Sequence, residues 1–192
     1  MTSTDKKPEI RVIRSGRRTL ALSVQRDGSV LVRAPFHVPD SEILRFAESH
    51  RDWISRQLQK QAEAEKARAE TEVLSREELE ALAEEALKWF PEQVRRFAAR
   101  IGVTYGRITV RNQKTKWGSC SSAGNLNFNC LLMMAPEQVR DYVIVHELCH
   151  RRQMNHSAAF WAEVERALPD YRGARQWLKQ HGAELMLRNP HA

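Results

Sequence analysis

Residues 136–157 read PEQVRDYVIVHELCHRRQMNHS, and this stretch decides how the carboxyl-terminal half of the chain is organised. A proline followed by a glutamate is typical of a first helical turn, where the missing N–H costs nothing and an acidic side chain meets the positive end of the helix dipole. The mostly apolar residues that follow predict a buried helix that runs to about Gln153. Inside it lies the pattern H-E-x-x-H, formed by His146, Glu147 and His150.

This pattern indicates a metal site because of helix geometry. Side chains four residues apart lie on one helical face, about 5–6 Å apart at Cβ, so His146 and His150 present two imidazoles together. Neutral imidazole nitrogens suit Zn²⁺. Buried histidines need polar partners, and a metal ion satisfies both rings at once. Glu147 flanks the ion without binding it, which is where a general base for a metal-bound water must stand.

A catalytic zinc ion usually has three protein ligands and one open position. His156 is the expected third ligand, provided that the helix ends after His150 and the chain turns back. Asn155 and Ser157 favour such a turn, because Asn tolerates left-handed backbone and Ser caps helices. The rival third ligands are carboxylates on the next predicted helix, namely Glu163, Glu165 and Asp170.

The rest of the chain predicts an α+β fold. Three β-rich runs within residues 9–35, separated by turn signals such as Asp27-Gly28, predict a small antiparallel sheet. Apolar residues from Ile43 to Leu58 lie on one helical stripe and predict a single helix. A second helix begins at the capping box of Ser75, and residues 114–125 predict a loop. We therefore expect a β subdomain over residues 1–40, a helical segment over 41–101 and a metal-binding catalytic core over 102–192, packed as one unit.

Composition narrows the class of protein. The chain has 192 residues and a formal net charge of +7, which favours anionic partners such as nucleic acid or nucleotides. No run of about 18 apolar residues predicts a membrane span. Three cysteines without a C-x-x-C pair, and no apolar segment behind Met1–Lys7, predict reduced thiols and a cytoplasmic protein without a secretory signal.

Several further motifs together resemble the YgjP-like metallopeptidase family, which is related to SprT-type and WLM-type zincins. The resemblance is close over residues 105–170 and looser toward the amino terminus. The residues that carry it are Lys116-Trp117-Gly118-Ser119-Cys120, Gly124, Leu126-Asn127-Phe128-Asn129, Pro136, Tyr142-Val143, His146-Glu147-Leu148-Cys149-His150, Asn155-His156-Ser157 and Phe160-Trp161. The family usually has Arg where this chain has Lys116, so the charge is kept but a bidentate contact is lost.

The resemblance implies His146, His150 and His156 as zinc ligands and Glu147 as the catalytic base. Mn²⁺ or another divalent ion is the alternative to zinc. It also implies a minimal, gluzincin-like zincin core, in which an edge strand lies along the active-site helix. We expect the strand at 126–132 to pair with an extended peptide or protein substrate.

Substrate contacts are expected from Lys116, Trp117 and Asn129. The residue that completes transition-state stabilisation is not identified by any pattern, and its candidates are Tyr142, Tyr171 and His181.

Three functions remain open at the level of sequence. The first is a metallopeptidase that uses a Glu-activated, metal-bound water. The second is a metal-dependent nucleoside triphosphate hydrolase, for which cations near the motif would hold the phosphates. Those cations are Arg111, Lys114, Lys116, Arg151 and Arg152. The third is a basic, nucleic-acid-associated module with structural zinc, which a three-ligand site disfavours because structural sites are usually closed.

Overall fold

A computed structural model describes residues 8–190, and by their contacts these form two compact units that meet between Glu70 and Thr71 in the sequence. The segment Met1–Lys7, on which the absence of a secretory signal was predicted, lies outside the described residues. Each unit is described by itself.

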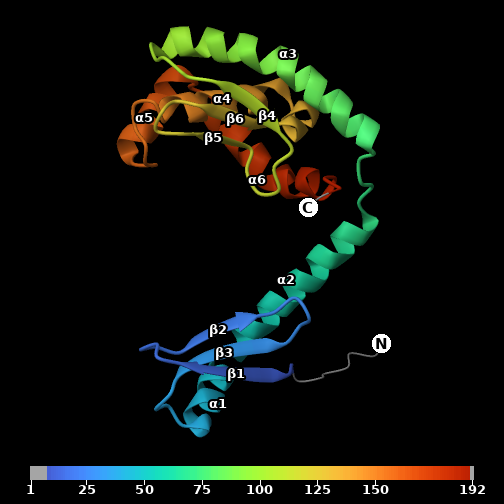
Figure 1. The fold of residues 1–192 in the computed structure, drawn as a ribbon, viewed down its shortest axis with the longest axis vertical. Coiled ribbons are helices and arrows are strands. Elements are labelled where there is room, and N and C mark those ends of the chain that lie inside the picture. The colour runs from blue at the N-terminus through green and yellow to red at the C-terminus, as the bar shows by residue number, and fades with distance from the viewer. Residues whose placement is uncertain (1–7, 191–192) are drawn as a thin grey trace. The chain divides into compact units, whose positions relative to one another are not determined.

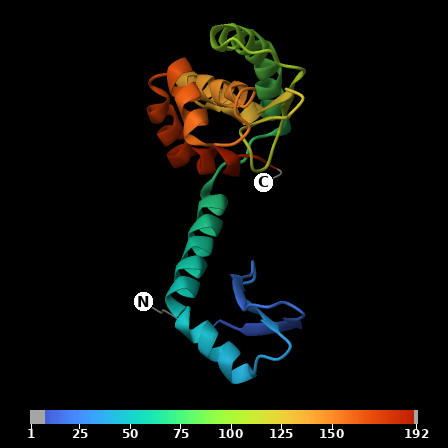
Figure 2. The same cartoon turned by 90° about the vertical axis from the view of Figure 1, so that its left-hand side faces the viewer.

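The N-terminal unit is a three-stranded sheet with helices on one face (Figure 2). Its elements are β1 (Ile10–Ser15), β2 (Ala21–Val24), β3 (Val30–Pro35), α1 (Asp40–Ser49) and α2 (Arg51–Glu70). The strand order is β1-β3-β2, in which β2 and β3 are antiparallel but β1 and β3 are parallel. The prediction of an antiparallel sheet was therefore wrong for β1. The connection after Ser15 places β2 away from β1, and β3 then lies between these two strands.

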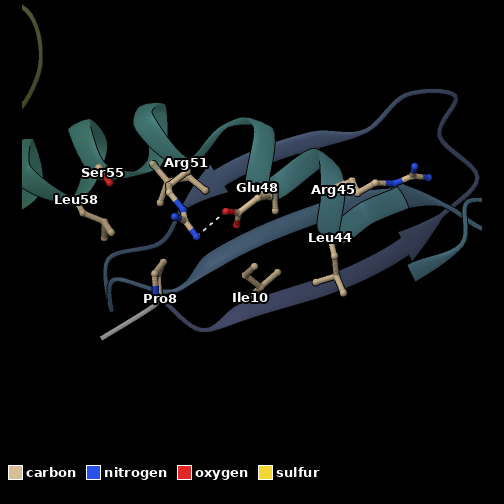
Figure 3. Close-up of a pocket in the computed structure, with 10 residues that line it drawn as sticks. Pro8, Ile10, Leu44, Arg45, Glu48, Arg51, Ser55 and Leu58 are labelled. Atoms are coloured by element: carbon tan, nitrogen blue, oxygen red, sulfur yellow. Dashed lines mark ion pairs between the residues drawn. The ribbon is translucent and has the colours of Figure 1, made fainter. Parts of the chain in front are cut away.

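The helical stripe after Pro39 is interrupted at His50, where sequence periodicity predicted one continuous helix. The Ser49 hydroxyl and His50 Nδ1 both bond to the carbonyl of Phe46, at 2.8 Å each, and so occupy the acceptor that the next helical N–H would use. Ile43, Ala47 and Ile54 still pack against the buried face of β3. Near α1, the Ile10 side chain and Leu44 remain partly exposed beside a shallow apolar pocket (Figure 3).

The C-terminal unit contains the H-E-x-x-H helix and its surroundings (Figure 1). Its elements are α3 (Arg76–Ile101), β4 (Ile108–Arg111), β5 (Gly118–Cys120), β6 (Leu126–Asn129), the 3₁₀ helix η1 (Cys130–Met134), α4 (Glu137–Cys149), α5 (Ala158–Ala167) and α6 (Tyr171–Leu187). Helix α4 packs against α3, α5, α6 and β5. The molecule is thus of the α+β class, with two small sheets and six α-helices among the described residues.

The second sheet differs from the prediction that the strand at 126–132 pairs with the substrate. Its order is β4-β6-β5, with β6 parallel to β4 and antiparallel to β5. The strand at 126–132 was expected to pair with a peptide, but β6 is central and both of its edges are occupied. The edge strand next to α4 is β5, which lies in the stretch 114–125 that sequence predicted to be a loop.

Strand β6 is also shorter than predicted. The buried Asn129 side chain accepts a hydrogen bond from the Leu131 N–H at 3.1 Å, and this turns the chain into η1.

Helix α3 follows its sequence signals closely. Ser75 and Glu78 form the predicted capping box through bonds of 3.2 and 2.8 Å, and Gly102 ends the helix with a φ of 73°. The helix continues through Pro91, and the carbonyl that this proline leaves without a backbone donor belongs to Leu87, an exposed residue.

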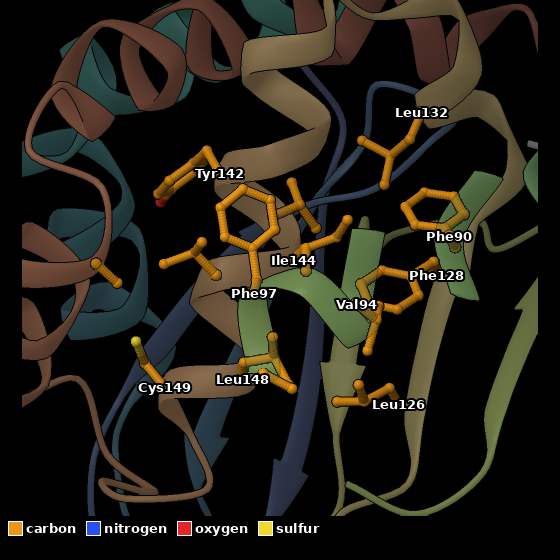
Figure 4. Packing of buried hydrophobic residues seen from close by; sticks show 14 of the residues in the cluster. Phe90, Val94, Phe97, Leu126, Phe128, Leu132, Tyr142, Ile144, Leu148 and Cys149 are labelled. Carbon is orange, nitrogen blue, oxygen red and sulfur yellow. The ribbon is translucent and has the colours of Figure 1, made fainter. Parts of the chain in front are cut away.

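The core of the C-terminal unit lies between α3, α4 and the sheet (Figure 4). The Phe90 ring from α3 stacks on Phe128 from β6, with centroids 4.5 Å apart and planes inclined by 3°. Val94, Ile144 and Leu148 surround the pair, and all five side chains are fully buried. This core holds α4 rigidly against the sheet, so the polar face of α4 is presented at a fixed position.

None of the helices within residues 8–190 combines the length and the apolar content that a membrane-crossing helix requires.

Replacing Phe128 by Ala should lower the free energy of unfolding of the C-terminal unit by about 3–5 kcal/mol, because the loss leaves a cavity under Phe90. Urea denaturation followed by circular dichroism measures this. Leu87→Ala is the control: this side chain is 57% exposed on α3, and its loss should change stability by less than about 0.5 kcal/mol. Equal effects of the two substitutions would contradict the assigned core.

Candidate metal centre

Three histidines come together at the carboxyl end of α4. His146 and His150 lie one helical turn apart, and His156 returns to them from the segment before α5. One ring nitrogen from each lies within 4.8 Å of the others, and the Nε2 atoms of His146 and His156 are 3.0 Å apart. Two nitrogens on one tetrahedral zinc ion would be about 3.3 Å apart, given bonds of about 2.0–2.1 Å. The spacing of this trio therefore suits a single divalent ion.

The chain turns back because α4 ends at Cys149, four residues earlier than predicted. The N–H groups of Arg151 and Arg152 donate to carbonyls three residues behind them, which tightens the last turn. Ser157 then caps α5 by accepting a bond from Phe160 N–H at 3.4 Å. The early helix end brings His156 to the pair.

A single buried side chain supports all three imidazoles. The Phe160 ring is fully buried, and its centroid lies 4.9 Å from that of His146, 4.6 Å from His150 and 4.8 Å from His156. Phe160 thus packs against all three rings and limits the rotamers open to them.

The hydrogen bonds of the rings leave nitrogens available for a metal. His150 Nδ1 lies 3.0 Å from the carbonyl oxygen of Gln153, and a carbonyl only accepts, so this nitrogen carries the proton and Nε2 is free. His146 Nδ1 is buried and has no hydrogen-bond partner among the described residues, so this ring makes its polar contacts through Nε2. The donor set is therefore chemically suited to zinc.

Glu147 is a buried carboxylate directly beside this trio. Its side chain faces Gly118 of β5, where a Cβ atom would lie 2.8 Å from Oε1 and 2.9 Å from Cγ of Glu147. Any larger residue at 118 would collide with the carboxylate. The glycine thus allows the carboxylate to lie between the histidines and the edge strand.

Burial controls the protonation of these groups. It raises the pKa of Glu147 to about 7, with the nearby Lys116 acting in the opposite direction. Burial, followed by the charges of His150 and His156, lowers the pKa of His146 to about 3. The imidazole of His146 is therefore neutral near pH 7, as a metal ligand must be. A carboxyl group with a pKa near 7 is able to both accept and donate a proton at that pH.

Two adjoining cavities open onto the site, and Lys116, Gly118, His146 and Glu147 line both. One contains all three histidines and has a volume of about 270 Å³. The other, of about 250 Å³, is bounded by Trp117 and residues of α4 and α6. Lys116 and Trp117, two of the predicted substrate contacts, thus border the site.

Asn129, the third predicted substrate contact, is fully buried. Its amide donates to the carbonyls of Gln113 and Lys116 at 2.9 and 3.0 Å. These bonds hold the loop that leads into β5, so Asn129 shapes the site from beneath and is not open to a ligand.

The three candidates for transition-state stabilisation lie in different surroundings. Tyr142 lines the smaller cavity, and burial raises its pKa to about 12. Tyr171 is buried and stacks on the rings of Tyr142 and Trp161. His181 is exposed on α6, where its ring packs against Trp177, and it borders neither cavity.

Two of the rival ligands, and two of the cations expected around a phosphate, have other partners. Glu163 pairs with Arg152 and Arg166, and Glu165 pairs with Arg172. Arg152 donates to the Ile101 carbonyl at 2.5 Å.

Arg151 crosses Gly124 and donates to the carbonyls of Thr104 and Ser122. Arg151 and Arg152 therefore anchor the end of α4 to neighbouring loops, and of the five cations expected around a triphosphate only Lys116 lines the two cavities of the site.

Sequence reasoning missed the roles of Gly118 and Phe160. Both belong to the motifs quoted above, but a glycine in a predicted loop and an aromatic residue in a helical stripe each have ordinary explanations. Their roles depend on contacts between segments about 30 and 10 residues apart, which no local pattern reveals.

Three histidines that could hold a metal ion, beside a buried carboxylate, form an arrangement typical of a metal-dependent hydrolase. The model of the YgjP-like metallopeptidase domain matches residues 18–82 and 69–181. The chain belongs to the YgjP-like metallopeptidase family, as its motifs suggested, and is a hydrolase enzyme. The family implies a divalent metal and a peptide substrate.

Two solved structures resemble this chain. The zymogen of the metallopeptidase abylysin from Pyrococcus abyssi is 23% identical with a TM-score of 0.44, and covers 52% of this chain and 96% of its own. The zymogen of jannalysin from Methanocaldococcus jannaschii is 21% identical with a TM-score of 0.42, and covers 47% and 93%. A comparison with curated protein sequences gives no match.

Replacing His156 by Ala should weaken zinc binding by at least about 100-fold, since it would remove one of the three expected ligands and not merely an outer hydrogen-bond partner. Competition with a chromogenic chelator measures the affinity. His181→Ala, an exposed histidine on α6, should leave it unchanged. If His156→Ala binds zinc normally and Glu163→Ala does not, the third ligand is the carboxylate.

In the metal-free protein, Glu147→Gln should become more stable relative to wild type as the pH rises. The folded pKa of Glu147 is raised from 4.5 to about 7, so its stabilising contribution is complete below pH 4.5 and is lost as the pH rises through 7. At about 1.4 kcal/mol per pKa unit, the difference should grow by about 2–3 kcal/mol.

Urea denaturation of both proteins with a chelator, between pH 4.5 and 8, measures this difference. The lowered pKa of His146 makes its contribution to stability change with pH in the opposite direction. This contribution is the same in wild type and in Glu147→Gln, so it cancels in the comparison. A difference that stays constant across this range would contradict the raised pKa of Glu147.

Proposed function

We propose that this protein is a zinc-dependent peptidase in which His146, His150 and His156 hold the ion and Glu147 is the general base. The observation that carries the proposal is the position of the Glu147 carboxylate, buried between the histidine trio and the edge strand β5. A water molecule and a peptide carbonyl can meet there in contact with both the carboxylate and the histidines.

A zinc ion held by the three imidazoles would polarise the scissile carbonyl and make a neighbouring water more acidic. Glu147 takes the proton from the attacking water as the new C–O bond forms, and then donates it to the amine as the C–N bond breaks. Burial supports both steps, because it raises the pKa of this carboxyl toward 7. The positive charge of a bound ion would offset part of this rise, which would keep the carboxylate ionised until it takes the proton from water.

The free edge of β5 is suited to binding an extended peptide. The Asn129 N–H donates to the Trp117 carbonyl at 2.8 Å, and Ser121 and Asn125 are bonded in the same way. Since hydrogen-bonded and non-hydrogen-bonded pairs alternate in an antiparallel ladder, Gly118 and Cys120 direct their backbone N–H and C=O groups away from β6. A substrate strand can pair with these groups.

We infer that this arrangement is the minimal zincin core that the resemblance implies, in which β5 is the edge strand along the active-site helix and pairs with the substrate in place of β6. Lys116 and Trp117, which precede β5, would border the bound peptide. Gly118 would lie against both the substrate and Glu147. Its backbone faces the substrate, and its lack of a side chain leaves room for the Glu147 carboxylate.

Glu147→Gln should lower kcat/KM for an unstructured protein such as casein by about 10²–10⁴-fold and leave zinc affinity nearly unchanged, because it removes the base but no ligand. Release of acid-soluble peptides by the zinc-loaded protein measures this. Glu165→Gln is the matched control, an exposed glutamate paired with Arg172, and should retain full activity.

If zinc-loaded wild type releases no peptides from casein or a diverse peptide library, the proposed activity is wrong. If Glu147→Gln cleaves as fast as wild type, the assignment of the base is wrong.

A further inference from the structure

The first strand of the N-terminal unit has an open, apolar edge. Strand β1 lies at one side of its sheet and pairs only with β3. Its residues Ile10, Val12 and Ile13 are 38%, 41% and 50% exposed. Natural edge strands usually carry a lysine, a proline or a bulge that prevents pairing with another chain. Residues 10–15 include neither lysine nor proline, and their register with β3 is continuous, so this edge is available for pairing.

The backbone of β1 directs three residues away from its sheet. The Val30 N–H donates to the Glu9 carbonyl at 2.8 Å, and Ile10 is the register partner of Val30. Along a strand, successive residues alternate between directing their N–H and C=O groups toward one neighbouring strand and toward the other side. Since Glu9 faces β3, the backbone groups of Ile10, Val12 and Arg14 point outward. The free edge of β1 thus offers three residues that can each donate and accept a hydrogen bond.

The two cations of β1 already have acidic partners. Arg11 pairs with Glu9 and with Asp27, both at 3.1 Å. Arg14 pairs with Asp40 at 2.5 Å. A polyanion such as nucleic acid would have to compete with these carboxylates for the same guanidinium groups. The edge therefore favours a partner that, like β1 itself, carries balanced charge.

The order of residues makes β1 complementary to a second copy of itself. In an antiparallel pairing centred on Val12, this residue lies opposite its own copy and Ile10 lies opposite Arg14, so that all three outward residues form hydrogen-bonded pairs. On the other face, Ile13 lies opposite Arg11, and no cation faces another. A shift of two residues in either direction leaves only two such pairs within the strand. In one direction it also places the two Arg11 side chains opposite each other.

The helix-facing side of β1 adds apolar surface to this edge. Ile10 and Val12 are in register with Val30 and Val32, which belong to the buried core of the unit. The pocket beside Ile10 is lined mainly by apolar residues, and Leu44 on α1 is 55% exposed there (Figure 3). A strand added at this edge would lie beside the pocket and reduce the exposure of Ile10 and Leu44.

We propose that β1 is a dimerisation strand: two copies of this chain associate through an antiparallel, twofold-symmetric pairing of β1 centred on Val12, which joins two three-stranded sheets into one of six strands. A self-complementary patch is what such a symmetric interface requires. Because the paired segments are short, the dimer is weak and forms at high protein concentration. The inference concerns the N-terminal unit and does not depend on the proposed peptidase function.

Sedimentation velocity of the full chain between about 5 and 500 µM measures this association, and wild type should convert from monomer toward dimer across this range. Val12→Lys should raise the dissociation constant of the dimer at least 10-fold, because it places two ammonium groups opposite each other at the twofold axis and removes an apolar contact. Val12→Thr keeps the shape and charge of the side chain and should stay within about 3-fold of wild type.

Two further variants locate the contact. Ile13→Lys should also raise the dissociation constant at least 10-fold, because it places a lysine opposite Arg11 of the second copy. Ser23→Lys adds the same charge to β2, at the opposite edge of the same sheet, and should leave association unchanged. Circular dichroism verifies folding. If Val12→Lys does not fold, Ile13→Lys carries the test, since this side chain is half exposed.

Three results would overturn the proposal. The first is a wild type that stays monomeric up to about 500 µM. The second is a dimer that neither β1 substitution weakens, or that Ser23→Lys weakens equally, because the contact then lies elsewhere. The third is a monomeric wild type whose binding to casein is weakened by Val12→Lys, because the edge then holds an extended polypeptide and not a second copy.

Discussion

The site depends on the packing of three imidazole rings around Phe160. Two of the rings come from one face of α4 and would lie together in any helix, but His156 reaches them only because α4 ends at Cys149. The buried Phe160 ring lies within 5 Å of all three ring centroids. Phe160 is apolar, so it packs against the three imidazoles without hydrogen bonding to them. On the other side of α4, α3 and the sheet hold this helix in place.

A second constraint connects the histidine trio to a surface for substrate. Glu147 and β5 approach so closely that only glycine fits at position 118. The same residue has its backbone groups on the free edge of the sheet, and its side-chain position faces the carboxylate. Peptide binding and proton transfer would therefore occur within one residue of each other. This close approach buries Glu147, and the burial raises the pKa of its carboxyl group.

The sequence was most informative where structure is local. The i,i+4 spacing, the capping box at Ser75 and the turn signals around Asn155 involve neighbouring residues, and each appears in the structure where expected. The failures were pairings between distant segments. Strand β5 consists of Gly, Ser and Cys, which have little strand preference, and it exists because β6 pairs with it. The parallel pairing of β1 with β3 likewise has no local signal. The proposed ligands could thus be named from the sequence, but not the strand that faces them.

X-ray absorption spectroscopy of the zinc-loaded protein tests the central claim most directly, because it identifies the atoms bound to the ion without requiring activity. The account predicts one zinc ion per chain, with nitrogen and oxygen neighbours at about 2.0–2.1 Å and the outer scattering of three imidazoles. A sulfur neighbour at about 2.3 Å would contradict it by assigning Cys120, which lines the same cavity, as a ligand. Scattering from only two imidazoles would contradict the convergence of His146, His150 and His156 on one ion.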